Sequence, residues 1–208
     1  MTIRTLRLPV VLLSCFITLT SLSGCATVDQ NIDLNYAPFE RSFGRNSGDI
    51  VVSRVDAQNI SKNSSGEWIV GSLNNVHGVH QADILSDRRV DEWITDALLL
   101  ELKHAGYTVS YSAKIPSSTG LGILVSEINS LLRVNQGTVS ADVRHDLKFN
   151  VDIFLNGFKA RSLTVASRNS KTLPLSTSKE EQEKIMLQSL QDAVQQIIPE
   201  ITTITGQK

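Results

Sequence analysis

The sequence predicts an α+β fold in which a mainly antiparallel sheet packs on two amphipathic helices in two layers. Three observations support this prediction. Residues 88–105 and 184–198 each place apolar side chains at the spacing of one helix face. Residues 138–155 alternate between apolar and polar side chains, as a long strand with one buried face does. Neither element can bury its apolar face alone, so we expect the sheet and the helices to cover each other.

The chain begins with the pattern of an export signal. Arg4 and Arg7 precede a short apolar run that ends in Leu22-Ser23-Gly24-Cys25. A membrane-spanning helix needs about 20 predominantly apolar residues, and this run is shorter and interrupted. A basic flank, a short apolar core and small residues before the cut are typical of a cleaved signal peptide.

Cys25 directly follows these small residues, which is the pattern of a lipobox. We therefore predict a lipoprotein signal peptide over residues 1–24, with Cys25 as the lipidation site. An acylated cysteine and polar tether are expected over 25–48, and a periplasmic α+β domain over 49–208. Several acyl chains on one residue make membrane anchoring stable. The alternative is a plain secreted protein with a chance cysteine here.

In the first half of the domain we expect two short strands and one clear helix. Residues 49–57 and 67–71 are rich in β-branched residues, and 59–66 and 74–85 read as loops. Ser86 or Asp87 is expected to cap the helix over 88–105. Gly106 is expected to end it, because glycine adopts a positive φ without steric cost.

In the second half, a strand over 107–112 leads into a long hairpin of residues 121–134 and 138–155. The Asn156-Gly157 pair predicts a two-residue turn into a further strand, 158–168. A regular register would place Asp152 opposite Arg161, with Phe158 and Ala160 facing the core.

The same register places Phe154, Leu163 and Val165 together on the opposite face. Because contiguous exposed apolar side chains usually mark interaction sites, these three residues are a candidate partner surface. The alternative is that the tether or the C-terminal tail around Ile201 and Ile204 covers them.

The chain is expected to end with a polar loop, residues 169–177, and a helix. Ser178 and Glu181 have the spacing of a capping box, and Pro199 is expected to stop the helix. The predicted order of elements is β-β-α-β-β-β-β-α.

Composition excludes several classes of function. Loss of Arg4 and Arg7 with the signal changes the formal charge from −1 to −3, which argues against nucleic acid or an anionic lipid surface as the main partner. Cys15 leaves with the signal and Cys25 is acylated, so no disulfide, cysteine nucleophile or thiolate metal site is expected.

No arrangement of residues predicts catalysis or a cofactor. His77 and His80 are three residues apart with Asp83 nearby, but a zinc site needs three or four ligands of defined geometry. His145 lies on the apolar face of a strand, where a structural role is expected. Glu101 falls within the apolar arc of the first helix without a second catalytic group beside it. We therefore expect no enzyme activity, no cofactor and no metal.

The layout resembles the YajG-like family of uncharacterised lipoproteins. The stretches that carry the resemblance are the lipobox, Gly106-Tyr107-Thr108-Val109, Asn135-Gln136-Gly137 and the helix over 184–198. The family has no established catalytic residues to transfer. Ala26 follows the cysteine instead of Asp, and resemblance to Gram-negative lipoproteins then implies sorting to the outer membrane.

These observations lead to three hypotheses of function. The preferred one is a non-enzymatic outer-membrane lipoprotein that faces the periplasm and binds an unknown envelope protein or lipid. The second is an accessory factor for lipid or lipopolysaccharide transport, which would need an apolar groove between sheet and helices. The third is a cell-wall hydrolase, for which no nucleophile, metal or acid pair is visible.

Overall fold

The computed structural model describes residues 28–39, 47–58, 60–174 and 178–206. It confirms the two-layer α+β fold. The elements in chain order are β1 (Gln30–Asn31), β2 (Asp49–Arg54), β3 (Trp68–Asn75), β4 (His80–Ser86), α2 (Val90–His104), β5 (Thr108–Tyr111), β6 (Leu121–Gln136), β7 (Ser140–Leu155), β8 (Phe158–Pro174) and α3 (Lys179–Gly206).

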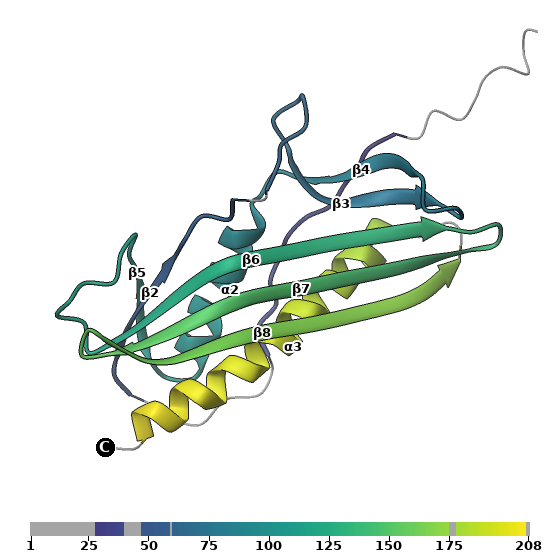
Figure 1. Ribbon diagram of the computed structural model, residues 1–208. Coiled ribbons are helices and arrows are strands. Elements are labelled where there is room, and N and C mark those ends of the chain that lie inside the picture. The colour runs from purple at the N-terminus through teal and green to yellow at the C-terminus, as the bar shows by residue number, and fades with distance from the viewer. Residues whose placement is uncertain (1–27, 40–46, 59, 175–177, 207–208) are drawn as a thin grey trace, which may run out of the picture.

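The sheet is built around three long strands and divides along β6 (Figure 1). β6, β7 and β8 form an antiparallel meander, and the Asn135-Gln136-Gly137 stretch leads into the β6–β7 turn as predicted. The other edge of β6 is shared by two parallel strands. β2 pairs with residues 121–125 and β3 pairs with residues 132–136. β5 extends the sheet beside β2, while β4 and β1 extend it beside β3.

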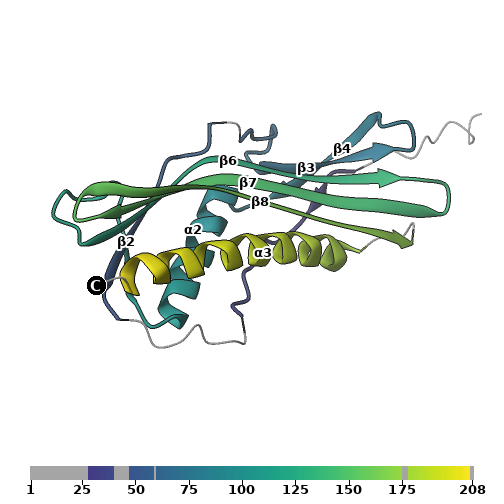
Figure 2. The ribbon, with the colours of Figure 1, turned by 60° about the horizontal axis from the view of Figure 1, so that its bottom comes forward.

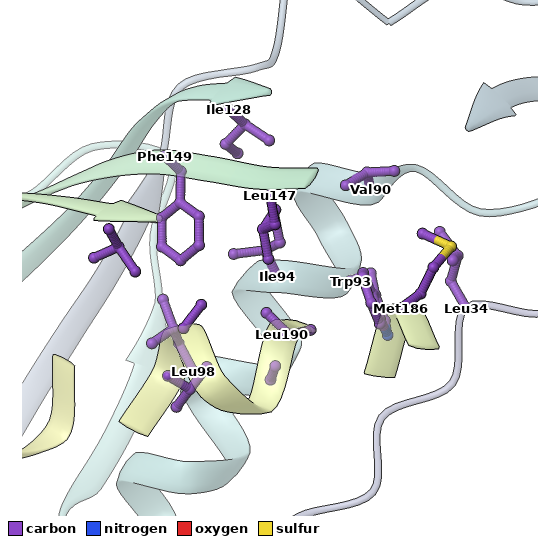
Figure 3. Close-up of a cluster of buried hydrophobic side chains, with 14 of the residues drawn as sticks. Leu34, Val90, Trp93, Ile94, Leu98, Ile128, Leu147, Phe149, Met186 and Leu190 are labelled. Carbon is purple, nitrogen blue, oxygen red and sulfur yellow. The ribbon is translucent and has the colours of Figure 1, made fainter. Parts of the chain in front are cut away.

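Both helices lie on one face of the sheet (Figure 2). The apolar side of β7 is the centre of the core, and its alternation is confirmed from Val143 to Ile153. The side chains that fill the interface are large and fully or almost fully buried (Figure 3): Trp93, Ile94, Leu98, Leu147, Phe149, Met186 and Leu190. These side chains fill the middle of the space between the sheet and the helices.

The N-terminal segment, residues 28–39, is part of the domain, so its assignment to a polar tether is wrong. β1 pairs with β4, and Ile32 and Leu34 are buried in the core. Figure 3 shows Leu34 beside Met186 of α3. We call residues 28–39 the strap, because they run along the helices under the sheet (Figure 2).

Polar side chains of the helices bind the backbone of the strap. The Trp93 indole donates to the Asn35 carbonyl at 3.1 Å, and Gln191 donates to the Ala37 carbonyl at 2.9 Å. The Asp33 amide donates to the Glu183 carboxylate at 2.7 Å. These hydrogen bonds replace those that the backbone groups of the strap would otherwise make to water, so the strap is fixed to both helices.

Two segments expected to be loops are strands. Residues 80–86, within the expected loop 74–85, form β4, which returns beside β3 after a turn at residues 75–79. Residues 169–174, assigned to a polar loop, continue β8. Their polar side chains suit a strand here because α3 binds them: Asn169 donates to Asp192 at 2.8 Å, and Lys171 to Glu181 at 2.9 Å.

The ends of the two helices agree with the sequence-based prediction only in part. Gly106 has a φ of 97° and follows α2 directly, as expected. Neither Ser86 nor Asp87 caps α2, because β4 continues to Ser86 and Arg89 occupies the N-cap position. Pro199 does not stop α3, which continues to Gly206; the buried Ile201, one turn after Ile197, extends the apolar stripe and supports the helix. No helix among the described residues is both long and apolar enough to cross a membrane.

Candidate binding trough

The predicted patch of Phe154, Leu163 and Val165 does not exist as one surface. The Asn156-Gly157 turn forms as predicted, with positive φ at both residues and Leu155 opposite Phe158. A register shift between Ile153 and Phe154 then moves the rest of β8 by one residue. Val165 lies opposite Phe149 and is buried in the core, and Leu163 lies opposite Val151 and packs on it. Only Phe154 is on the face away from the helices.

The same shift makes the predicted Asp152–Arg161 pair wrong. Asp152 faces Ser162, which donates to it at 2.6 Å, and Lys159 forms an ion pair with it at 2.6 Å. Arg161 points to the helix side and pairs with Glu200 of α3. Phe158 and Ala160 are exposed instead of facing the core. Cys25, the predicted lipidation site, lies outside the described residues.

Glu101 holds the strap. Its carboxylate is fully buried and accepts hydrogen bonds from the Tyr36 hydroxyl at 2.7 Å and the Phe39 amide at 2.8 Å. Burial is the main cause that raises the pKa of Tyr36 well above its usual range, and the hydrogen bond to Glu101 and the charge of Glu101 raise it further. The carboxylate does not reach solvent and pairs with no basic side chain among the described residues, and its contacts indicate a structural role.

The histidines are not brought together. His80 lies 3.3 Å from Asp83, but no group of three or more metal-binding side chains occurs in the described parts of the chain. His145 is buried on the core face, with its Nε2 2.8 Å from the Ser130 hydroxyl. Burial lowers the pKa of His145 to about 4, against a smaller opposing effect of the Asp146 charge. The Asp146 side chain is on the other face of β7, so the two do not form a catalytic pair.

Asp91, in the first turn of α2, is held by several hydrogen bonds. Its side chain is inaccessible, and Arg89 binds both of its oxygens at 2.9 and 2.5 Å. The Ala57 amide donates to it at 3.2 Å. Burial alone would raise the pKa of Asp91. The hydrogen bonds from Arg89 and Ala57 and the charge of Arg54 outweigh burial, so the pKa of Asp91 lies below its usual value. Asp91 thus joins the chain after β2 to the start of α2.

The sheet face that the helices leave uncovered carries an apolar groove at one end. Its volume is about 950 Å³, and the loop over residues 112–120 forms one of its walls. Leu124 and Phe154 contribute to its floor. Gly122 lets the loop approach the sheet, because a Cβ there would lie 2.6 Å from Ile115. Ser53 also lines the groove, and its hydroxyl is buried with no hydrogen-bond partner among the described residues.

Two further depressions continue this groove along β6. The second, about 560 Å³, shares Val55, Asp56 and Gln58 with the first. The third, about 580 Å³, shares Asn129 and Lys148 with the second. We call the three together the trough. It passes the point where β2 and β3 diverge from β6 and where Glu127 adopts a φ of 52°.

The end of the trough away from the apolar groove is basic. Arg133, Arg144 and Arg168 surround the single carboxylate of Asp146, with Arg144 at 2.8 Å and Arg168 at 2.5 Å. Burial raises the pKa of Asp146, but the hydrogen bonds and charges of these arginines outweigh it and hold the carboxyl below its usual value. One carboxylate cannot neutralise three guanidinium groups, so this end attracts negative charge.

Sequence reasoning located one residue of the trough, Phe154, and missed the others. The alternation of β7 does assign Arg144 and Asp146 to the face away from the core. The partners on β6, β8 and the loop over 112–120 depend on the register shift and on chain segments that come together only in the fold.

Comparisons with known proteins return similarity only at the level of structure. No protein-family model matches the chain, and no curated protein matches it. The resemblance to the YajG-like family therefore stays a prediction.

Three solved structures illustrate the similarity. A DUF330 protein from Xanthomonas campestris is 13% identical, covers 88% of this chain and 97% of its own, and has a TM-score of 0.48. A minor lipoprotein from Acinetobacter baumannii is 14% identical over 75% of this chain and 91% of its own, with a TM-score of 0.46. A putative neuraminyllactose-binding hemagglutinin homolog from Helicobacter pylori is 12% identical over 83% and 95%, with a TM-score of 0.43. At these values the similarities support no conclusion about function.

Proposed function

We propose that the protein is a non-enzymatic envelope lipoprotein, anchored through Cys25 to the outer membrane and facing the periplasm, whose domain binds an extended segment of another envelope protein. The observation that carries the proposal is the continuous trough along β6 on the uncovered face of the sheet.

The shape of the trough favours a segment of protein chain. An elongated series of depressions suits an extended polypeptide better than a compact small molecule. The apolar groove would take one or two large apolar side chains, and the basic end would take acidic side chains. Between Leu124 and Leu131 the β6 chain covers about 20 Å at the rise of a strand. The partner segment would therefore carry acidic residues about six positions from its apolar ones.

Two acids on this face of the sheet support binding over catalysis. Asp146 lines the basic end of the trough and is engaged by arginines, and Asp152, which does not line the trough, is engaged by Lys159 and Ser162. Burial raises the pKa of Asp152, but the bonds from Lys159 and Ser162 outweigh it and keep the pKa low. An ionised, hydrogen-bonded carboxylate is a poor proton donor, so a hydrolase would need a general acid from elsewhere.

The second candidate is a lipid or lipopolysaccharide transport factor. The same groove favours it in part, because its lining is largely apolar and a basic end could take a phosphate group. In this case an acyl chain would occupy the groove next to Ile115 and Phe154. The middle of the space between sheet and helices, where we first expected such a groove, is filled.

Photocrosslinking in cells separates these functions. A photoreactive residue replaces Ser117 at the rim of the groove, and the Val55→Asp variant adds a charge to the lining. We expect a crosslinked protein that disappears with Val55→Asp. The matched control is Phe158→Asp, which changes an exposed aromatic residue outside the trough and should leave the product intact. A product that carries lipid supports the transport factor, and a product insensitive to Val55→Asp contradicts both.

Anchoring is tested by Cys25→Ser. We expect this variant to lose lipid labelling and to leave the membrane fraction. Continued lipid labelling of the variant would contradict the assignment of Cys25.

A further inference from the structure

The end of the sheet opposite the apolar groove bears exposed valines on two adjacent turns. The turn between β3 and β4 presents Val76 and Val79, which are 63% and 58% exposed. The turn between β6 and β7 presents Val139, which is 82% exposed. Valine is unusual at such positions, because turns favour Gly, Asn, Asp, Ser and Pro.

The strand registers bring these two turns together. β3 and β6 are parallel, with Asn75 opposite Gln136, so the turns that follow both strands project from the same end of the sheet. The Asn74 amide donates to the Asn135 side chain at 3.1 Å and joins their bases. Figure 1 shows both turns at this end. We call residues 75–79 and 137–139 the valine tips.

The valine tips and the strand ends next to them carry no formal charge. Neither residues 71–82 nor residues 134–141 contain Asp, Glu, Lys or Arg. The turn at the other end of the sheet differs, since Lys159 and Arg161 follow it directly. An uncharged, apolar tip avoids the large cost of moving an ionised group out of water.

The N-terminal end of the strap lies beside the same end of the sheet. β1 runs parallel to β4, and the Asp83 amide donates to the Asp29 side chain at 2.9 Å. Val28, which precedes β1, is 75% exposed. Cys25 is three residues before Val28, a distance of at most about 11 Å in extended chain. Because the strap is fixed to both helices, the domain cannot move far from an acyl anchor on Cys25.

We propose that the valine tips rest on the lipid surface and insert Val76, Val79 and Val139 among the headgroups. The proposal rests on the anchoring of Cys25 given above and deepens it by assigning an orientation. The anchor and the tips together hold the sheet end-on to the membrane. Apolar side chains of peripheral segments typically enter about 5–10 Å into the boundary between headgroups and acyl chains.

The test uses the acylated full-length lipoprotein in vesicles of phosphatidylethanolamine and phosphatidylglycerol. Cys25 is acylated, so an introduced cysteine is the single free thiol of the mature chain. An environment-sensitive fluorophore is attached to Val79→Cys or Val139→Cys, and lipids that carry a quencher at the headgroup are added. The matched control is Phe158→Cys at the opposite end, where the side chain is 80% exposed. All three side chains are exposed and lie in a turn or directly next to one, so the variants should fold.

We expect the lipid quencher to reduce fluorescence by about twofold or more at positions 79 and 139 and to leave position 158 unchanged. Protein that floats with the vesicles but is quenched at neither tip would overturn the orientation while leaving the anchor intact. Equal quenching at all three positions would also overturn it, because the domain would then lie flat or tumble. Protein that fails to float would overturn the anchoring and the orientation with it.

Discussion

His145 should make the stability of the domain depend on pH between about 4 and 6.5. Its pKa is lowered from the ordinary value of 6.5 to about 4, because the ring is buried on the core face of β7. Between these two values the unfolded chain binds a proton that the folded chain excludes. The free energy of unfolding therefore falls as the pH is lowered through this range.

The size of the effect follows from the two pKa values. Each tenfold change in proton affinity is worth about 1.4 kcal/mol, so the full separation corresponds to about 3 kcal/mol. Between pH 7.5 and pH 5 the expected loss is about 2 kcal/mol. Asp91, Asp146 and Asp152 have lowered pKa values, so the stability they contribute is lost mainly at lower pH, as it falls below their unfolded values.

Urea unfolding followed by tryptophan fluorescence measures this loss, since Trp93 is buried in the same core. The His145→Gln variant keeps a polar side chain beside Ser130 but cannot titrate. Its unfolding free energy should change by less than about 0.5 kcal/mol over the same range. His104→Gln removes an exposed histidine and should behave like the wild type. A wild type with constant stability from pH 7.5 to 5, or a His145→Gln variant that loses as much, would refute the reasoning.

Two further predictions concern the buried carboxylates. Glu101→Ala removes the acceptor of the Tyr36 hydroxyl and should lower the free energy of unfolding by about 1–3 kcal/mol, with faster hydrogen exchange in the strap than in β7. Glu101→Gln retains an acceptor and should lower it by less. Equal losses for the two variants would contradict this role of Glu101. Asp91→Ala removes the buried carboxylate that Arg89 binds and should lower the free energy of unfolding by about 3 kcal/mol. Glu92→Ala removes a more exposed carboxylate and should lower it by less than about 1 kcal/mol in the same thermal or urea unfolding assay. Similar costs for the two changes would show that Asp91 is not held as described.

The long meander could be predicted from the sequence because its signals are local. The period-two pattern of β7 and the Asn156-Gly157 turn depend only on neighbouring residues. The register shift next to that turn has no such signal, since neither Gly nor Pro marks it at Ile153 and Phe154. A shift by one residue exchanges the two faces of a strand. The missed shift therefore moves Leu163 and Val165 to the core face and separates them from Phe154.

The strap was missed because its apolar pattern is short. Ile32, Leu34 and Tyr36 do alternate, but only over five residues, between polar stretches on both sides. The end of β8 was missed for a different reason. There both faces are polar, one towards water and the other towards the acids of α3, so no alternation is visible. The trough as a whole could not be predicted, because most of its residues come from segments that only the tertiary fold brings together.

The division of the sheet along β6 has a consequence for the order in which the domain assembles. The β6–β7–β8 meander needs only contacts between adjacent strands, so its loop-closure cost is small. β2 and β3 pair with a strand that lies much later in the chain, and they can dock only once β6 has formed. The strap contacts α3 across a separation of 150 residues at Asp33 and 154 at Ala37. We therefore expect the strap to dock last, which leaves the chain next to Cys25 accessible until folding is nearly complete.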